Sequence, residues 1–206
     1  MKNKLILLLG FVFLLSMTAF AQEYPKFEVP VGFSFVNVHP NQAAITSFNV
    51  FGGGGGFVYN VNSLFGIKAD LMGYTQGSGV KVSQNGQFLG NVSGNLFTYM
   101  FGPQIKKHSG KFQPFGEALF GAAHTNLDAN LCKLEGGCGS GSGSNNGFAM
   151  EYGLGLDIPI TKTIQLRPVE VDYLYTHFGS NHIAGASASQ NNFKYFAGVN
   201  FTFGNK

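Results

Sequence analysis

The sequence has little charge, no tryptophan and, beyond its first residues, no long apolar run. Only 11% of its residues are charged, and the formal net charge of +3 falls by two to +1 when Lys2 and Lys4 leave with a leader. A chain this close to neutral is not typical of nucleic-acid binding, so we expect no nucleic-acid partner. After residue 22 no apolar stretch reaches the ~20 residues of a transmembrane helix, so we expect no membrane-spanning helix.

The first 21 residues have the layout of a secretory signal peptide. Lys2 and Lys4 precede an apolar run over residues 5–15, and a small-x-small site ends at Ala21. A retained membrane helix is the alternative, but the run is shorter than the ~20 residues that span a bilayer. We therefore expect cleavage after Ala21 and one domain over residues 22–206, with no further domain after it.

The sequence is rich in glycine and phenylalanine, and it contains stretches in which one residue in two is apolar. It contains 30 Gly and 22 Phe, and its clearest stretch is NFKYFAGVNFTF at residues 192–203. Alternate residues of a strand face opposite sides of a sheet, so one face here is apolar throughout and the other carries Lys194, Asn200 and Thr202. A closed barrel in lipid turns such a face outward and pairs both edges of the strand. The stretch is also about the 9–11 residues that cross a bilayer at a tilt.

Seven further stretches complete a barrel pattern. They lie at about residues 27–36, 48–59, 65–74, 97–105, 112–125, 148–158 and 169–175. The connections between the eight stretches alternate long and short, beginning and ending with long ones. This layout predicts an all-β fold, namely an eight-stranded antiparallel transmembrane up-and-down β-barrel. The alternation leaves open which face of the second and fifth stretches is turned outward.

The connections carry their own signals. Asn85-Gly86 lies between alternating residues and predicts a hairpin that continues two strands beyond the membrane. We place a short turn at residues 106–111 and a long Gly/Ser-rich loop at residues 126–147. The run at residues 52–56 consists of five glycines, and no helix follows it, so we expect it to allow close packing or bending of the wall and not to cradle phosphate.

The charged residues fall mainly on the expected inner faces. Alternation places seven of the ten acidic residues and two lysines there: Glu28, Lys68, Asp70, Glu117, Glu151, Asp157, Glu170, Asp172 and Lys194. Arg167 joins them if a bulge at Pro168 shifts the alternation; a position at the headgroup boundary is the alternative. The inward face of a soluble sandwich is apolar, so this pattern argues against a sandwich. An eight-stranded barrel is filled by its own side chains, so these charges must pair or hold water.

Two interpretations of the inner charges stay open. The preferred one is a salt-bridge network that plugs the barrel and has a structural role. The alternative is a narrow porin-like channel for small polar solutes or cations, with a cation preference set by the surplus of carboxylates. Paired carboxylates also suit acid/base catalysis, but a plugged lumen gives a substrate no access.

The strand count, the loop asymmetry, the ending FKYFAGVNFTF and the segment RPVEVDYLYTHFG resemble the OmpA-like outer-membrane β-barrel family. The resemblance implies an integral protein of the bacterial outer membrane, in contact with lipid and lipopolysaccharide. It also implies that the barrel-assembly machinery recognises the last strand. The signal residues would be Tyr195, Val199, Phe201 and Phe203, displaced from the chain end by three residues.

The long connections hold the remaining candidates. Cys132 and Cys138 predict a loop-closing disulfide, with a metal pair or free thiols as alternatives. We expect a structural or surface-interaction role, through an extracellular partner that binds the loops. Some barrels of this shape are lipid A-modifying hydrolases, for which the candidates are His177, Ser180 and His182. Three residues separate His177 from Ser180, which turns them to opposite faces of an extended strand, whereas a loop can bring them together, so a hydrolase stays the third hypothesis.

We therefore expect no enzyme, no cofactor and no metal site. Four histidines lie near the extracellular rim, where a metal site is the alternative to solvated side chains. They are His39, His124, His177 and His182.

Overall fold

The computed structural model describes residues 24–38, 48–76, 80–84, 87–132, 138–178 and 189–205. The expected signal peptide lies outside these residues. The strands are β1 (Pro25–Val38), β2 (Phe48–Asn60), β3 (Phe65–Thr75), β4 (Val80–Gln84), β5 (Gln87–Lys106), β6 (Gln113–Cys132), β7 (Cys138–Pro159), β8 (Ile164–Phe178) and β9 (Ser189–Asn205). No helix among the described residues is long and apolar enough to cross a membrane.

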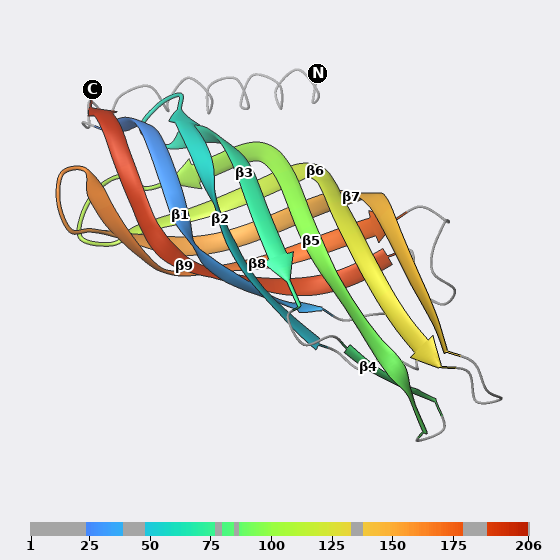
Figure 1. Cartoon of the computed structure of the whole chain (residues 1–206). Coiled ribbons are helices and arrows are strands. Elements are labelled where there is room, and N and C mark those ends of the chain that lie inside the picture. The colour runs from blue at the N-terminus through green and yellow to red at the C-terminus, as the bar shows by residue number, and fades with distance from the viewer. Residues whose placement is uncertain are drawn as a thin grey trace, which may run out of the picture.

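The strands form a closed antiparallel barrel (Figure 1). Each wall strand pairs with its neighbours in sequence, and β9 returns to pair with β1 from Pro25↔Asn205 to Asn37↔Phe193. Of the described strands, β4 alone lies outside the wall, because it pairs only with residues 87–92 of β5 while β3 pairs with residues 95–105. The expected eight-stranded up-and-down barrel is confirmed.

The two ends of the barrel differ. Residues 61–64, 107–112 and 160–163 connect strands by short turns at one end, here called the turn end. The other end, here called the loop end, carries two hairpins, β4–β5 and β6–β7, that extend beyond the wall (Figure 1). The hairpin expected around Asn85-Gly86 is confirmed by the β4–β5 pairing, although the turn itself lies outside the described residues.

Two predicted connections were wrong. The loop expected at residues 126–147 is largely a hairpin, because β6 and β7 stay paired out to Cys132↔Cys138. The turn expected at residues 106–111 begins one residue later, because Lys106 is the last residue of β5 and is buried. Antiparallel strands pair through backbone hydrogen bonds, and outside a bilayer neither face of the pair has to be apolar. A Gly- and Ser-rich segment can therefore continue the pairing without alternating apolar and polar residues.

The alternation of inward and outward side chains is confirmed, and the structure shows which face of β2 is turned outward, a point that the sequence left open. In β2 the side chains of Val50 and Val58 are buried, and those of Phe51, Phe57 and Tyr59 are exposed. The outer surface is a band of large apolar side chains that reaches 84% exposure at Phe33. On the outer face of a closed sheet, such a band is what lipid solvates.

Glycines allow the wall strands to approach the side chains inside. In β6 a Phe115 ring fills the space beside Gly155, where a Cβ would collide with it. In β2 a Cβ at Gly54 would collide with the Leu71 carbonyl oxygen and with Met72. The expected role of the glycine run in close packing therefore has a specific cause: β2 lies directly against β3 and its inward side chains.

Candidate functional site

All nine charged residues expected inside the barrel are inside it. Each is at most 7% exposed: Glu28, Lys68, Asp70, Glu117, Glu151, Asp157, Glu170, Asp172 and Lys194. Arg167 is also inside and fully buried, because the β8–β9 register shifts between Arg167 and Glu170. This shift is the bulge expected at Pro168, and it brings residues 167 and 170 to the same face.

Arg167 and Lys106 organise the turn end of the network. The Arg167 guanidinium donates Nε to Asp157 Oδ1 at 2.8 Å and Nη2 to Asp157 Oδ2 at 2.9 Å, and Nη1 donates to Glu170 Oε2 at 2.7 Å. The Arg167 Cζ atom lies 4.1 Å from the centre of the Phe115 ring, so an aromatic face covers the cation. The Lys106 Nζ donates to Glu28 Oε2 at 2.5 Å and to Asp157 Oδ2 at 2.7 Å. Asp157 therefore joins two cations from different strands.

Two lysines organise the middle of the lumen. The Lys68 Nζ lies 2.7 Å from Glu117 Oε1 and 3.3 Å from Glu170 Oε1. The Lys194 Nζ lies 2.6 Å from Glu151 Oε1 and 3.1 Å from Asp172 Oδ2. Each ammonium thus bridges two carboxylates.

Asp70 lies between the two lysines. Its Oδ1 is 3.4 Å from Lys68 Nζ and its Oδ2 is 3.9 Å from Lys194 Nζ. The bridges connect β3, β6, β7, β8 and β9 across the lumen, so the network ties together strands that are not neighbours in the wall.

Several members of this network were not predicted from the sequence. Lys106 could have been found, because it continues the inward alternation of residues 98–104; the strand was ended one residue too early. His108 had no such signal, since it follows the strand. Its Nδ1 lies 2.8 Å from the Ser63 carbonyl oxygen and its Nε2 lies 2.8 Å from Glu28 Oε1. Buried amides complete the network: Asn60, Gln104, Gln113, Gln165 and Asn200.

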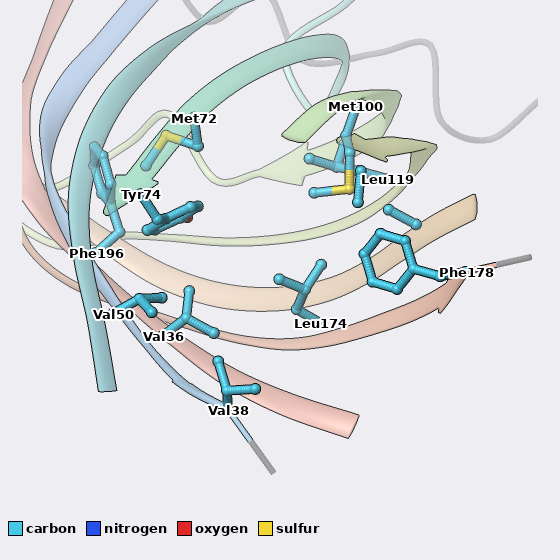
Figure 2. Close-up of a cluster of buried hydrophobic side chains, with 12 residues drawn as sticks. Val36, Val38, Val50, Met72, Tyr74, Met100, Leu119, Leu174, Phe178 and Phe196 are labelled. Carbon is cyan, nitrogen blue, oxygen red and sulfur yellow. The ribbon is translucent and has the colours of Figure 1, made fainter. Parts of the chain in front are cut away.

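The lumen also contains an apolar cluster, which the expected polar interior did not include. It lies toward the loop end of the strands and consists of Val36, Val38, Val50, Met72, Tyr74, Met100, Leu119, Ala123, Ala149, Leu174, Phe178 and Phe196 (Figure 2). These side chains come from every wall strand, and they are at most 6% exposed. The described interior is therefore polar in one part and apolar in the other.

The other candidates lie apart from the lumen. His177 is exposed, and its Nδ1 lies 2.9 Å from Ser189 Oγ. Ser180 and His182 lie outside the described residues, as does His39, so no hydrolase constellation is assembled by the described part of the chain. His124 Nδ1 lies 2.6 Å from Asn146 Oδ1.

The loop-closing disulfide stays a prediction. The backbone register places Cys132 directly opposite Cys138 at the end of the β6–β7 hairpin. Directly opposite residues of antiparallel strands have Cα atoms about 4.5–5.5 Å apart, which is within the range of disulfides.

The proposed assembly residues face outward on β9. Tyr195 is stacked on Phe35 of β1 with ring centres 4.7 Å apart, and Phe203 is 49% exposed. Val199 and Phe201 lie opposite Val31 and Val29 of β1. The same four residues thus form part of the lipid-facing seam at which β9 meets β1.

A closed eight-stranded barrel with an apolar outer band and a charged interior defines an outer-membrane β-barrel. The family model described as the outer membrane protein beta-barrel domain matches residues 7–203, so the chain belongs to this family. It is an integral protein of the bacterial outer membrane.

Solved structures agree on the fold. The chain is similar to Ail, the attachment invasion locus protein of Yersinia pestis, with a TM-score of 0.58 and 14% identity over 87% of this chain and 99% of that one. A second Ail structure, in complex with the heparin analogue sucrose octasulfate, gives a TM-score of 0.53 and 17% identity over 86% and 97%. Neisserial surface protein A gives a TM-score of 0.57 and 13% identity over 86% and 97%. No curated protein sequence matches the chain.

Proposed function

We propose that this barrel is a membrane anchor with a closed lumen, and that it acts through the hairpins at its loop end. The observation that supports a closed lumen is the filling of the barrel by its own side chains. Ion pairs occupy the turn end and the middle, and an apolar cluster occupies the part toward the loop end. In this family layout the short turns face the periplasm and the loop end faces outward.

The length of the hairpins supports the surface role. β7 has 22 residues and β6 has 20, about twice the 9–11 residues that cross a bilayer. The excess length presents Gly-, Ser- and Asn-rich backbone to the outside.

The charge of the hairpins indicates the kind of partner. The heparin analogue is bound by Ail, and heparin-like polyanions need a basic surface. Here the hairpin residues Lys81 and Lys133 are offset by Asp128 and Glu135. We therefore assign the loop end a partner of low net charge.

Further contacts follow from the same proposal. The outward band contacts membrane lipid and the lipid part of lipopolysaccharide. The barrel-assembly machinery recognises the outward residues of β9, namely Tyr195, Val199, Phe201 and Phe203. No role in catalysis is proposed.

A hairpin-shortened variant tests the surface role. Residues 128–142 are replaced by a two-residue Asn-Gly turn, which leaves the wall part of β6 and β7 intact. Cells displaying the wild-type or the shortened barrel are applied to an array of immobilised matrix proteins and neutral polysaccharides. We expect at least one array member to retain wild-type cells and to retain about tenfold fewer cells that display the variant, which corresponds to weaker binding of the shortened barrel. Equal retention across the array would contradict the role of this hairpin.

The second candidate function is a narrow cation pathway. The surplus of carboxylates over cationic side chains among the described lumen residues favours it. A liposome-swelling assay with small sugars and with potassium salts separates the two functions. The closed barrel leaves swelling at the rate of empty liposomes, whereas a pathway accelerates swelling in the salt alone.

A further inference from the structure

The described interior carries more negative than positive charge. Seven buried carboxylates share it with four buried lysine and arginine side chains: Glu28, Asp70, Glu117, Glu151, Asp157, Glu170 and Asp172 against Lys68, Lys106, Arg167 and Lys194. The four cations leave three of the seven negative charges unbalanced. An unbalanced charge inside a barrel is costly, so positive charge must come from elsewhere.

The excess of negative charge is concentrated in the middle of the lumen. Glu117 on β6, Glu151 on β7, and Glu170 and Asp172 on β8 each offer one oxygen, and these four oxygens lie within 4.8 Å of one another. Lys68 bridges one pair and Lys194 bridges the other. At the turn end, in contrast, Glu28 and Asp157 have Lys106 and the two-bond contact of Arg167.

Buried oxygens around this cluster have spare capacity to accept a ligand. Among the described residues, Glu151 Oε2 and Asp172 Oδ1 accept no hydrogen bond although both side chains are fully buried. Asp70 belongs to another strand and is not one of the four, yet its Oδ2 also accepts none, and it is 4% exposed. Buried polar atoms are normally satisfied, and oxygens that carry negative charge are satisfied best by a cation.

We propose that the centre of the lumen binds one hard divalent cation of the calcium class through Glu117, Glu151, Glu170 and Asp172. Calcium takes oxygen ligands at about 2.3–2.6 Å, so ligands on opposite sides are about 4.6–5.2 Å apart. The four oxygens match this spacing, whereas magnesium, at about 2.0–2.1 Å, would need them to contract. The two charges of the cation balance two of the three excess negative charges, and the ion ties β6, β7 and β8 together on the inside.

The test uses the mature barrel refolded in detergent without lipopolysaccharide, either in EDTA or in calcium chloride. Equilibrium dialysis with radioactive calcium measures binding, and the heat-dependent mobility shift measures stability. We expect about one calcium per barrel and an unfolding temperature at least ~5 °C higher in calcium than in EDTA.

Variants locate the ion. Glu151→Gln combined with Asp172→Asn is expected to weaken calcium binding at least ~100-fold and to remove the temperature difference, because two of the four ligands lose their charge. Asp128→Asn is the matched control; it removes a carboxylate of β6 outside the cluster and is expected to bind as the wild type does. If the double variant does not fold, Glu117→Gln replaces it, with an expected loss of at least ~10-fold.

Three results overturn the proposal. The first is a folded wild-type barrel that retains no calcium after refolding in it. The second is binding that is equal in the wild type and in a folded lumen variant, which places the ion elsewhere. The third is a stability that responds to pH and not to calcium, since protons would then neutralise the excess carboxylates. The site is independent of the proposed surface role, because shortening the β6–β7 hairpin leaves all four ligands in place.

Discussion

At the residue scale, the interior depends on a few cations that each hold several carboxylates. Arg167 is fully buried and makes hydrogen bonds to both Asp157 and Glu170. In a buried pair, the loss of one partner costs more than the pair contributes, because the other charge stays behind without compensation.

Replacing Arg167 with Gln tests this dependence. The change leaves Lys106 as the only cation in contact with Asp157 and Lys68 as the only cation in contact with Glu170, so we expect the free energy of unfolding to fall by ~3–5 kcal/mol. Urea unfolding of the barrel refolded in vesicles measures it. Lys111→Gln, at an exposed position in a turn, is the control and should change stability by less than ~0.5 kcal/mol. Equal effects of the two changes would show that the interior pairs carry no stability.

The alternation pattern predicted most of these residues, because a strand that separates lipid from a lumen must alternate between apolar and polar side chains. It missed Lys106 because strand ends are set by hydrogen bonding and not by the alternation itself. It could not find His108, whose position depends on a turn that brings it over Glu28 on β1. It also could not pair the charges, since the partners of Lys68 come from β3, β6 and β8.

At the element scale, the wall is shaped by glycines that face inward. Gly54 of β2 lies where a Cβ would meet the Leu71 carbonyl oxygen and the Met72 side chain and Cα. Since the obstacle includes backbone of the paired strand β3, it cannot be relieved by a rotamer change alone.

Gly54→Ala therefore has a specific expected cost. We expect it to lower the free energy of unfolding by ~1–3 kcal/mol, because the added methyl group forces β2 and β3 apart. Gly143→Ala in β7 is the matched control, since a Cβ there meets nothing within 4 Å, and it should be neutral to within ~0.5 kcal/mol. Urea unfolding in vesicles compares the two. A Gly54→Ala barrel as stable as the control would mean that the glycine run has no packing role.

The longest segment that was predicted wrongly from the sequence lies beyond the barrel wall. The distal parts of β6 and β7 contain Gly, Ser and Asn without alternation, yet every residue from Asn126 to Cys132 is paired with β7. In water neither face of such a ribbon has to be apolar, so the composition carries no signal for a strand. Inside the bilayer both faces are constrained, and there the strands were predicted.

At the scale of the whole molecule, the barrel is closed around its circumference, and we propose that it is also closed along its axis. β9 pairs with β1 and with β8, so no strand edge of the wall is left open. Along the axis, the ion-pair network is followed by the apolar cluster. The alternation of residues and the layout of eight stretches predicted the closed wall. The division of the lumen into a polar and an apolar part was not predicted, because it depends on which inward residues lie at the same height in the barrel, and this is set by the strand tilt and register.

The closed lumen is the central claim, and single-channel conductance in a planar bilayer tests it most directly. The refolded barrel, shown to be folded by its heat-dependent mobility, is compared with Glu151→Gln and Asp157→Asn, each of which removes one lumen carboxylate. We expect no steady conductance steps from the wild type, because the ion pairs and the apolar cluster leave no continuous path for water or ions. Steady, cation-selective steps from the wild type that change in the two variants would contradict the closed lumen and make the inner carboxylates the selectivity groups of a channel.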